Sequence, residues 1–357
     1  MAGMFGHLNI SDSDRNFINT VGQSVVWDAV QEYLTRVNAE LDAATSVFVE
    51  ETTSDFKRRY KLPGGGTLQR RGPDGRYAAV KAIGQWDVAF PLEDFGAQIA
   101  SNDVDMAYMT AAELERHFQT VINQNVSTVR LEMLKALFRA TAATFVDPIQ
   151  GSLSIEPLAN GDSVTYPPIL GVDVDATEDH VLSTGYAVSA ISDSNNPFET
   201  VKGELEEHFG APSGGSNIAV FVDPLTIPYA EALTDFDYVE DNYVRPGADA
   251  DILTGLPTGL PGRLVGRTNG CWVVEWRQIP ATYLLAVHLD APAPLIKRID
   301  PADTGLGEGL RLVAENEAFP FKGSFWRNRF GFGVGNRLNG VVAIISAAGY
   351  SVPSAFA

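Results

Sequence analysis

The chain contains very little cysteine: Cys271 is the single one among 357 residues. One cysteine excludes an internal disulfide framework and is typical of a reducing compartment. Long apolar runs are missing too. The nearest, GVVAIISAAG, falls far short of the roughly 18 residues that span a bilayer, so we expect no membrane partner. The N-terminal sequence also lacks the basic region and apolar run of a secretory signal. We therefore expect the protein to be made in the cytosol.

Motifs of catalysis and cofactor binding are also missing. The sequence has no G-x-S-x-G, H-E-x-x-H or Walker motif. In the glycine-rich segment Gly331–Asn336, Asn336 takes the place of the last glycine of a dinucleotide fingerprint, and GVVAII follows instead of a helix. The segment Asp173–Asp179 resembles the start of a calcium loop. Glu178 stands where that loop needs glycine, so only a weak surface cation site is left open.

The residues best suited to metal binding or nucleophilic chemistry are scattered. Five histidines lie far apart and none has metal-ligand spacing: His7, His117, His180, His208 and His288. We interpret His117 as a helix-packing residue, because it lies beside an apolar stripe. Cys271 has no histidine nearby in sequence and follows a strand pattern, which predicts a buried structural thiol. The sequence predicts no catalytic residue, no metal site and no cofactor, and hence no enzyme.

Charge is abundant but unevenly distributed. The net charge of −19 argues against a dedicated nucleic-acid binder, since phosphate contacts dominate such affinity. The span Val172–Asp251 is strongly acidic, with only Lys202 and Arg245 as basic residues. One short segment is basic instead, with Asp74 as its only acid: Lys57, Arg58, Arg59, Lys61, Arg70, Arg71, Arg76 and Lys81. The acidic span and the basic segment are either two solvated surfaces or surfaces that contact each other between copies of the chain. The second alternative is physically reasonable because electrostatic fields of opposite sign steer association and fix register.

The basic segment has the pattern of a projecting arm. Strand-like residues at Phe56–Leu62 and Arg76–Trp86 flank GGGTLQRRGPDG, which is rich in turn formers. An isolated two-stranded ribbon is marginal in water, so we expect the arm to lie against another, acidic surface. Before the arm, apolar residues at helical spacing predict a helix from Gln23 to about Ala44. That helix could pack on its own domain or on a neighbouring copy.

A long helix is predicted from Ala111 to Phe145, since no glycine or proline interrupts it. Thr110 and Glu113 form a capping box at its start. We expect it to back a sheet through one apolar stripe: Leu114, Phe118, Val121, Ile122, Val129, Leu134, Leu137 and Phe138.

The remainder alternates strands, loops and short helices, which gives an α+β pattern. SLSIEPL and SVTYPPIL predict a hairpin about the turn at Asn160–Asp162. Helices are predicted at 197–209 and Leu225–Leu233, and a buried strand at IAVFV. CWVVEW and TYLLAVHL predict two strands joined near Ile279 and Pro280. The C-terminal segment predicts strands with glycines at bends.

The order of these elements resembles the Hong Kong 97-type major capsid protein of tailed bacteriophages over nearly the whole chain. The segments that carry the resemblance are FPLEDFGAQI with the capped helix, WRQIPATYLLAV, and RNRFGFGVGNRLNGVVAII. The resemblance implies an N-terminal arm at 1–51 and an extended loop at 52–98. It also implies a peripheral domain with a spine helix at 99–171, an axial domain at 172–305, and C-terminal strands at 306–357 that return to the peripheral domain.

The resemblance also implies the function and the partners. We expect a structural protein that self-assembles as pentamers and hexamers into an icosahedral virion shell, built in the host cytoplasm around double-stranded DNA that it does not bind by sequence. The basic residues of the extended loop would contact a neighbouring subunit. Scaffolding, portal and decoration proteins are implied partners, and a loop lysine could crosslink to Asn336 or Asn339. An encapsulin-type compartment and a soluble acidic α+β enzyme or binding module are the alternatives.

Overall fold

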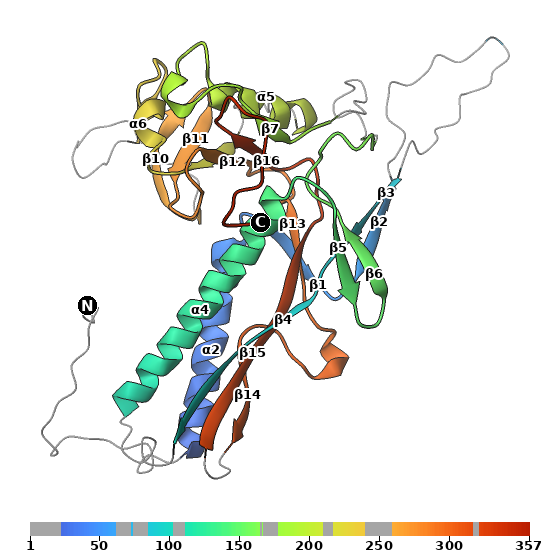
Figure 1. Cartoon of the computed structure of the whole chain (residues 1–357), viewed down its shortest axis with the longest axis vertical. Coiled ribbons are helices and arrows are strands. Elements are labelled where there is room, and N and C mark those ends of the chain that lie inside the picture. The colour runs from blue at the N-terminus through green and yellow to red at the C-terminus, as the bar shows by residue number, and fades with distance from the viewer. Residues whose placement is uncertain are drawn as a thin grey trace, which may run out of the picture. The chain divides into compact units, whose positions relative to one another are not determined.

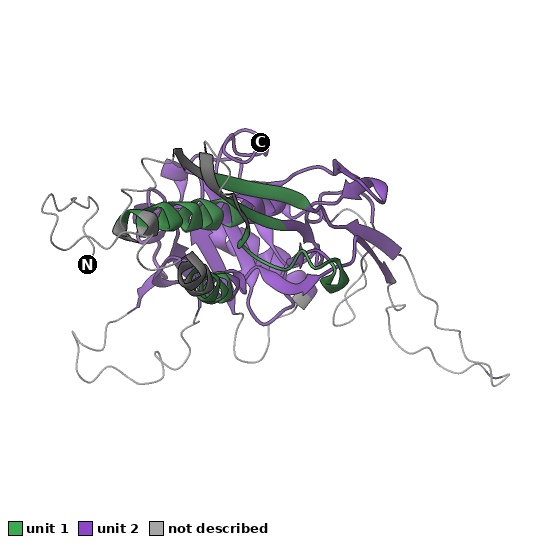
Figure 2. Ribbon diagram, turned by 90° about the horizontal axis from the view of Figure 1, so that it is seen from below, with its two compact units in different colours: residues 1–41, 93–129, 301–329 green, residues 42–92, 130–300, 330–357 purple. Residues whose placement is uncertain are grey.

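A computed structural model describes residues 23–61, 73, 85–102, 111–164, 166, 178–209, 217–239, 259–316 and 321–357. The chain divides into two compact units, which are coloured separately in Figure 2. Unit 1 comprises Met1–Leu41, Glu93–Val129 and Pro301–Arg329. Unit 2 comprises Asp42–Leu92, Arg130–Asp300 and Phe330–Ala357. Within the described ranges, no helix combines the length and the apolar character that a membrane crossing requires.

Helices and strands are mixed along the whole chain (Figure 1). The helices are α2 (Gln23–Thr45), α4 (Ala111–Phe138), α5 (Pro197–Phe209) and α6 (Ile227–Ala230), with 3-10 turns at Val188–Ala190 and Ala302–Thr304. The first strands are β1 (Val49–Thr53), β2 (Lys57–Lys61), β3 (Gln85–Ala89), β4 (Glu93–Asn102), β5 (Ala143–Asp147), β6 (Gly151–Ile155), β7 (Val181–Ser183) and β8 (Ile218–Val222). The later strands are β9 (Asp237–Tyr238), β10 (Arg263–Thr268), β11 (Cys271–Glu275), β12 (Tyr283–His288), β13 (Leu295–Arg298), β14 (Arg311–Asn316), β15 (Phe321–Val334) and β16 (Val341–Ile344).

Unit 1 packs two helical segments against long strands. Residues of α2, of the first part of α4, and of β4, β14 and β15 share one apolar core: Val30, Leu34, Val121, Ile122, Leu310, Leu312 and Trp326. The ring of Trp326 lies 5.2 Å from that of Phe118 on α4. Hydrogen bonds between Asn38 and the backbone of Leu310 also hold α2 in place. The helix predicted from Gln23 is confirmed, and it packs on its own chain.

Unit 2 is built around a mixed seven-stranded sheet in the order β7-β16-β12-β8-β11-β10-β9. Helix α5 packs on this sheet through Phe198, Val201 and Leu205, which are all buried. The predicted strands β8, β11 and β12 and the helix α5 are confirmed. The junction of β11 and β12 near Ile279 does not make them neighbours, however. Strand β8 lies between them, parallel to β11 and antiparallel to β12, and its five residues are all buried.

Two short antiparallel pairs also belong to unit 2. The base of the predicted arm is present as the pair β2–β3, with Tyr60 opposite Trp86, and the residues 76–84 of its second strand lie outside the described residues. The predicted hairpin of SLSIEPL with SVTYPPIL stays a prediction, because most of SVTYPPIL lies outside the described residues. Strand β6 pairs with the preceding strand β5, and Asn160 forms an isolated bridge with Asp179.

The long helix is shorter than predicted. It ends at Phe138, and residues Ala143–Asp147 form β5. At 1.5 Å per residue its 28 residues span about 42 Å. The phenol of Tyr350 donates to the carbonyl of Phe138 at 2.8 Å, which satisfies one carbonyl of the last turn. Helix α6 is likewise only four residues long, where Leu225–Leu233 was predicted.

Candidate functional site

The base of the arm is held by ion pairs within the chain. Arg59 and Asp87 are opposite each other across β2 and β3, and Arg59 Nε lies 2.6 Å from Asp87 Oδ1. Lys57 Nζ lies 2.6 Å from the other carboxylate oxygen. Hydrogen bonds from Arg59 and then from Lys57 hold the pKa of Asp87 far below its usual range. On the outer side of β2, Arg58 pairs with Glu51 and Asp55. The start of the arm is therefore electrostatically neutralised by its own chain.

A buried arginine fixes the end of β3. Arg298 on β13 donates from Nη1 to the carbonyl of Phe90 at 2.8 Å, and its Nη2 lies 2.9 Å from Asp147 Oδ2. Asp147 also accepts from the backbone amides of Ile149 and Gln150. These contacts join β13, the turn after β5 and the residue that follows the arm. The arm therefore begins and ends on fixed backbone.

Two glycines of β15 allow the backbone after the arm to approach closely. A Cβ at Gly331 would lie 2.1 Å from the carbonyl oxygen of Pro91, and one at Gly333 would lie 2.6 Å from the ring of Phe90. Any side chain there would collide with this backbone. The two glycines of GFGV are therefore explained by packing.

The apolar stripe of α4 lies in the core of each unit. Val121, Ile122 and Val129 are buried in unit 1, and Phe118 is packed against the same cluster. Leu134, Leu137 and Phe138 are buried in unit 2. These positions agree with the predicted stripe. The side chain of Leu114 and the capping residue Thr110 lie outside the described residues. His117 is exposed, so its interpretation as a packing residue is wrong.

The structure covers only part of the basic set predicted to contact another subunit. Lys57, Arg58 and Arg59 are the described members, and each has an acidic partner in its own chain. Lys61 is paired with Gln85 in the ladder, and nothing further is described of its side chain. The other four lie outside the described residues: Arg70, Arg71, Arg76 and Lys81. The contact with a neighbouring subunit stays a prediction that now centres on these four.

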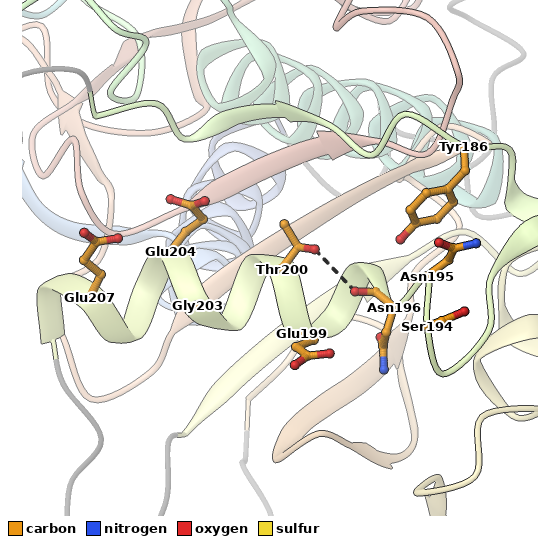
Figure 3. A pocket seen from close by; sticks show the side chains of 9 residues that line it. All are labelled: Tyr186, Ser194, Asn195, Asn196, Glu199, Thr200, Gly203, Glu204 and Glu207. Atoms are coloured by element: carbon orange, nitrogen blue, oxygen red, sulfur yellow. Dashed lines mark hydrogen bonds between the residues drawn. The ribbon is translucent and has the colours of Figure 1, made fainter.

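A polar pocket of about 470 Å³ follows one side of α5 (Figure 3). Its acidic residues Glu199, Glu204 and Glu207 come from successive turns of the helix, and Asn196 caps the start by accepting from the Phe198 amide. Burial and the neighbouring charges of Glu178 and Glu207 raise the pKa of Glu204 to about 7. Among the described lining residues there is no histidine, cysteine or lysine. The described lining of the pocket therefore consists of carboxylates, amides and hydroxyls.

Sequence reasoning missed one cluster in unit 2. Glu178, His180 and His208 converge, although 28 residues separate the two histidines. Burial by itself would raise the pKa of Glu178, but the two imidazoles outweigh it and hold this pKa at about 2. Only the tertiary packing of α5 on the sheet brings these residues together, so no spacing rule could have found them. Cys271, in contrast, is the predicted buried thiol, with its pKa raised by burial to about 12.

No protein-family model and no curated protein sequence matches this chain. Solved structures do match it. A structure from Mycobacterium phage Patience covers 98% of both chains at 18% sequence identity, with a TM-score of 0.71. The capsid of the native GTA particle covers 85% of this chain and 90% of its own, at 13% identity and a TM-score of 0.48. The capsid of Cyanophage P-SCSP1u covers 85% and 87%, at 11% identity and a TM-score of 0.49.

The likeness to the Patience structure extends over the arm base, the long helix and both units, because almost all of both chains is covered. Along the described chain, strands β2 and β3 precede the long helix α4, and the strands from β5 to β16 follow it. This chain has the Hong Kong 97-type fold.

Proposed function

We propose that this chain is the major capsid protein of a tailed bacteriophage, a structural protein that assembles into the virion shell. The observation that carries the proposal is the likeness over 98% of both chains to a structure from a phage. A fold that serves as a repeating shell unit needs surfaces that meet other copies, and the projecting arm is such a surface. Symmetry then adds many modest contacts into a stable particle.

The base of the arm supports an intersubunit role for its tip. Arg298 fixes the backbone after β3, and Lys57 and Arg59 both pair with Asp87. The segment between Lys61 and Gln85 is thus attached to a rigid stem, and it carries Arg70, Arg71, Arg76 and Lys81 against one acid, Asp74. Four cations at the end of a fixed stem suit an acidic surface of a neighbouring copy. The span Val172–Asp251 is the acidic part of the chain.

The finer assignments are part of the same proposal. The arm at 1–51, the extended loop at 52–98, the peripheral domain at 99–171, the axial domain at 172–305 and the C-terminal strands at 306–357 would form one subunit. Pentamers and hexamers of this subunit would close an icosahedral shell around double-stranded DNA, assembled in the host cytoplasm. Confinement would retain the DNA, since the chain has 45 acidic against 26 basic residues. Scaffolding, portal and decoration proteins would complete the particle.

Sedimentation of the purified full-length chain tests the proposal. We expect capsomers of five or six copies, or megadalton particles, at micromolar protein. A chain that stays monomeric or dimeric at every concentration contradicts the proposal. The alternative of a soluble acidic α+β enzyme or binding module would then be favoured. Particles that enclose an enzyme instead of DNA would identify a nanocompartment of the encapsulin type.

A further inference from the structure

Three buried side chains of unit 2 point their polar atoms at one another. Nε2 of His180 lies 3.1 Å from Glu178 Oε1, and Nε2 of His208 lies 2.8 Å from the same oxygen. One potential ligand atom from each residue lies within 4.8 Å of the other two. The exposed fraction is 5% for Glu178, 0% for His180 and 7% for His208. This density of imidazole and carboxylate away from water requires a physical explanation, because buried polar groups are costly unless satisfied.

The protons of His180 can be assigned from its partners. Its Nδ1 lies 2.9 Å from the carbonyl oxygen of Gly340. A carbonyl only accepts hydrogen bonds, so Nδ1 carries the hydrogen. In a neutral imidazole Nε2 then has no hydrogen and can only accept a hydrogen bond. It faces the carboxylate of Glu178, which can also only accept hydrogen bonds when it is ionised. Two acceptors face each other at 3.1 Å, which is favourable only when a cation or an additional proton lies between them.

The backbone holds the first two residues rigidly. The amide of Gly161 donates to the carbonyl of Glu178 at 2.8 Å, and the amide of His180 donates to the carbonyl of Ala159 at 2.8 Å. On the other side, the amide of Val342 donates to the carbonyl of His180 at 2.9 Å. His208 comes from the last turn of α5, whose apolar face is buried on the sheet. The three groups are therefore held in place by secondary structure, as a binding site requires.

We propose that Glu178, His180 and His208 bind one divalent transition-metal ion, zinc by preference. Two imidazole nitrogens and one carboxylate oxygen are a donor set that zinc favours, with a fourth position left for water or another ligand. The bond from His180 Nδ1 to a backbone carbonyl is the second-shell contact that orients metal-binding histidines. The ion would join the end of α5 to the segment directly before β7, the strand at the sheet edge, and this role goes beyond the proposed function.

The separations suit such an ion. Zinc bonds to nitrogen and oxygen are about 2.0–2.2 Å long, which in a tetrahedron places ligand atoms roughly 3.4 Å apart. The distances of 3.1 and 2.8 Å would need to grow by about 0.3 and 0.6 Å to reach this separation. Glu204 lies one helical turn before His208, so a second carboxylate is available on the same helix face.

Metal titration of the full-length protein tests the proposal. The protein is freed of metal with a chelator, dialysed, and titrated with Zn²⁺ alone by calorimetry, and with Co²⁺ alone by its visible absorption. We expect one ion per chain and a higher Tm with zinc. Because even second-shell partners contribute 10–100-fold to metal affinity, His208→Gln and Glu178→Gln should each lower the affinity by more than about 100-fold. His117→Gln changes an exposed histidine on α4 and serves as the matched control.

A second measurement covers the case in which the buried variants do not fold. X-ray absorption at the zinc edge of the wild-type protein should show imidazole in the ligand shell. A wild-type chain that takes up no stoichiometric zinc overturns the proposal. Full affinity in both variants, or a shell without imidazole, also overturns it. None of these results bears on shell assembly, which sedimentation tests separately.

Discussion

The guanidinium of Arg298 lies 2.9 Å from the carboxylate of Asp147, and both side chains are buried. The same arginine donates to the carbonyl of Phe90, directly after the arm. One side chain thus neutralises a buried acid and fixes the backbone from which the arm returns. This relationship makes the stability of unit 2 and the position of the arm depend on each other.

Replacing Arg298 with methionine should lower the free energy of unfolding by about 3–5 kcal/mol, because Asp147 would keep a buried charge without its partner. Urea denaturation of the unassembled chain measures this. Arg263 pairs with Glu275 but its side chain is 71% exposed, so Arg263→Met should cost less than about 1 kcal/mol. Equal losses in the two variants would show that the Arg298 pair contributes no more than a surface pair.

Asp147 should also make stability fall in acid. Burial by itself would raise its pKa, but hydrogen bonds from the amides of Gln150 and Ile149 and from Arg298 outweigh burial and lower the pKa. A carboxyl with a depressed folded-state pKa contributes stability above its unfolded pKa, near 3.9, and the contribution is lost as pH falls through the folded value. Thermal denaturation from neutral pH to below about pH 3 should show a steeper acid loss in wild type than in Asp147→Asn. Identical slopes would contradict this.

Two glycine substitutions should act in opposite directions. In Gly331→Ala the new methyl group would collide with the carbonyl of Pro91, so we expect a loss of about 1–3 kcal/mol. Gly203 lies inside α5 with open space around it, and Gly203→Ala should raise stability by about 0.5–1 kcal/mol through helix propensity. Paired urea titrations test both. A neutral Gly331→Ala would mean that β15 moves away from Pro91 without cost.

The end of α4 should depend on Tyr350. Tyr350→Phe removes the hydrogen bond to the carbonyl of Phe138 and should cost about 0.5–1.5 kcal/mol. Phe138→Ala deletes a fully buried ring that lies 5.3 Å from that of Phe356, and should cost about 3–5 kcal/mol. Chemical denaturation gives both values. If Tyr350→Phe lowered the free energy of unfolding more than Phe138→Ala, the hydrogen bond would contribute more than the buried ring, which would contradict this prediction.

Local chemistry explains why some elements were predictable. Helix α5 begins at Pro197 after its Asn196 cap, and both signals are adjacent in sequence. The strands β8, β11 and β12 are apolar runs of strand length. Their order in the sheet is a different matter, because β8 pairs with both of the others across long sequence separations. Periodicity contains no information on such pairing.

The end of α4 and the Glu178 cluster show the same limit. The apolar stripe gives no reason to stop at Phe138, and the group that caps this end, Tyr350, lies 212 residues away. Of the two histidines in the cluster, His208 lies on α5 and His180 directly precedes β7, and α5 meets the sheet only in the folded chain. In both places tertiary contacts decide the outcome. The basic arm was predictable, but not that Glu51, Asp55 and Asp87 would neutralise its base.

The arm tip provides the assembly prediction. Arg70→Glu with Arg71→Glu should prevent or slow shell formation while Tm stays unchanged, because the tip would then repel an acidic surface. Arg59→Glu is the contrasting variant, since it disturbs Asp87 within the same chain and should alter the arm base. Light scattering follows assembly. If the Arg70 and Arg71 double variant formed normal shells, the prediction that the tip's positive charge drives assembly would be wrong.

Electron cryo-microscopy of the assembled full-length protein tests the central claim most directly. We predict closed icosahedral shells in which each subunit has the fold described above and the segment between Lys61 and Gln85 lies on a neighbouring subunit. Particles without icosahedral symmetry, or a protein that never forms closed shells, would contradict it.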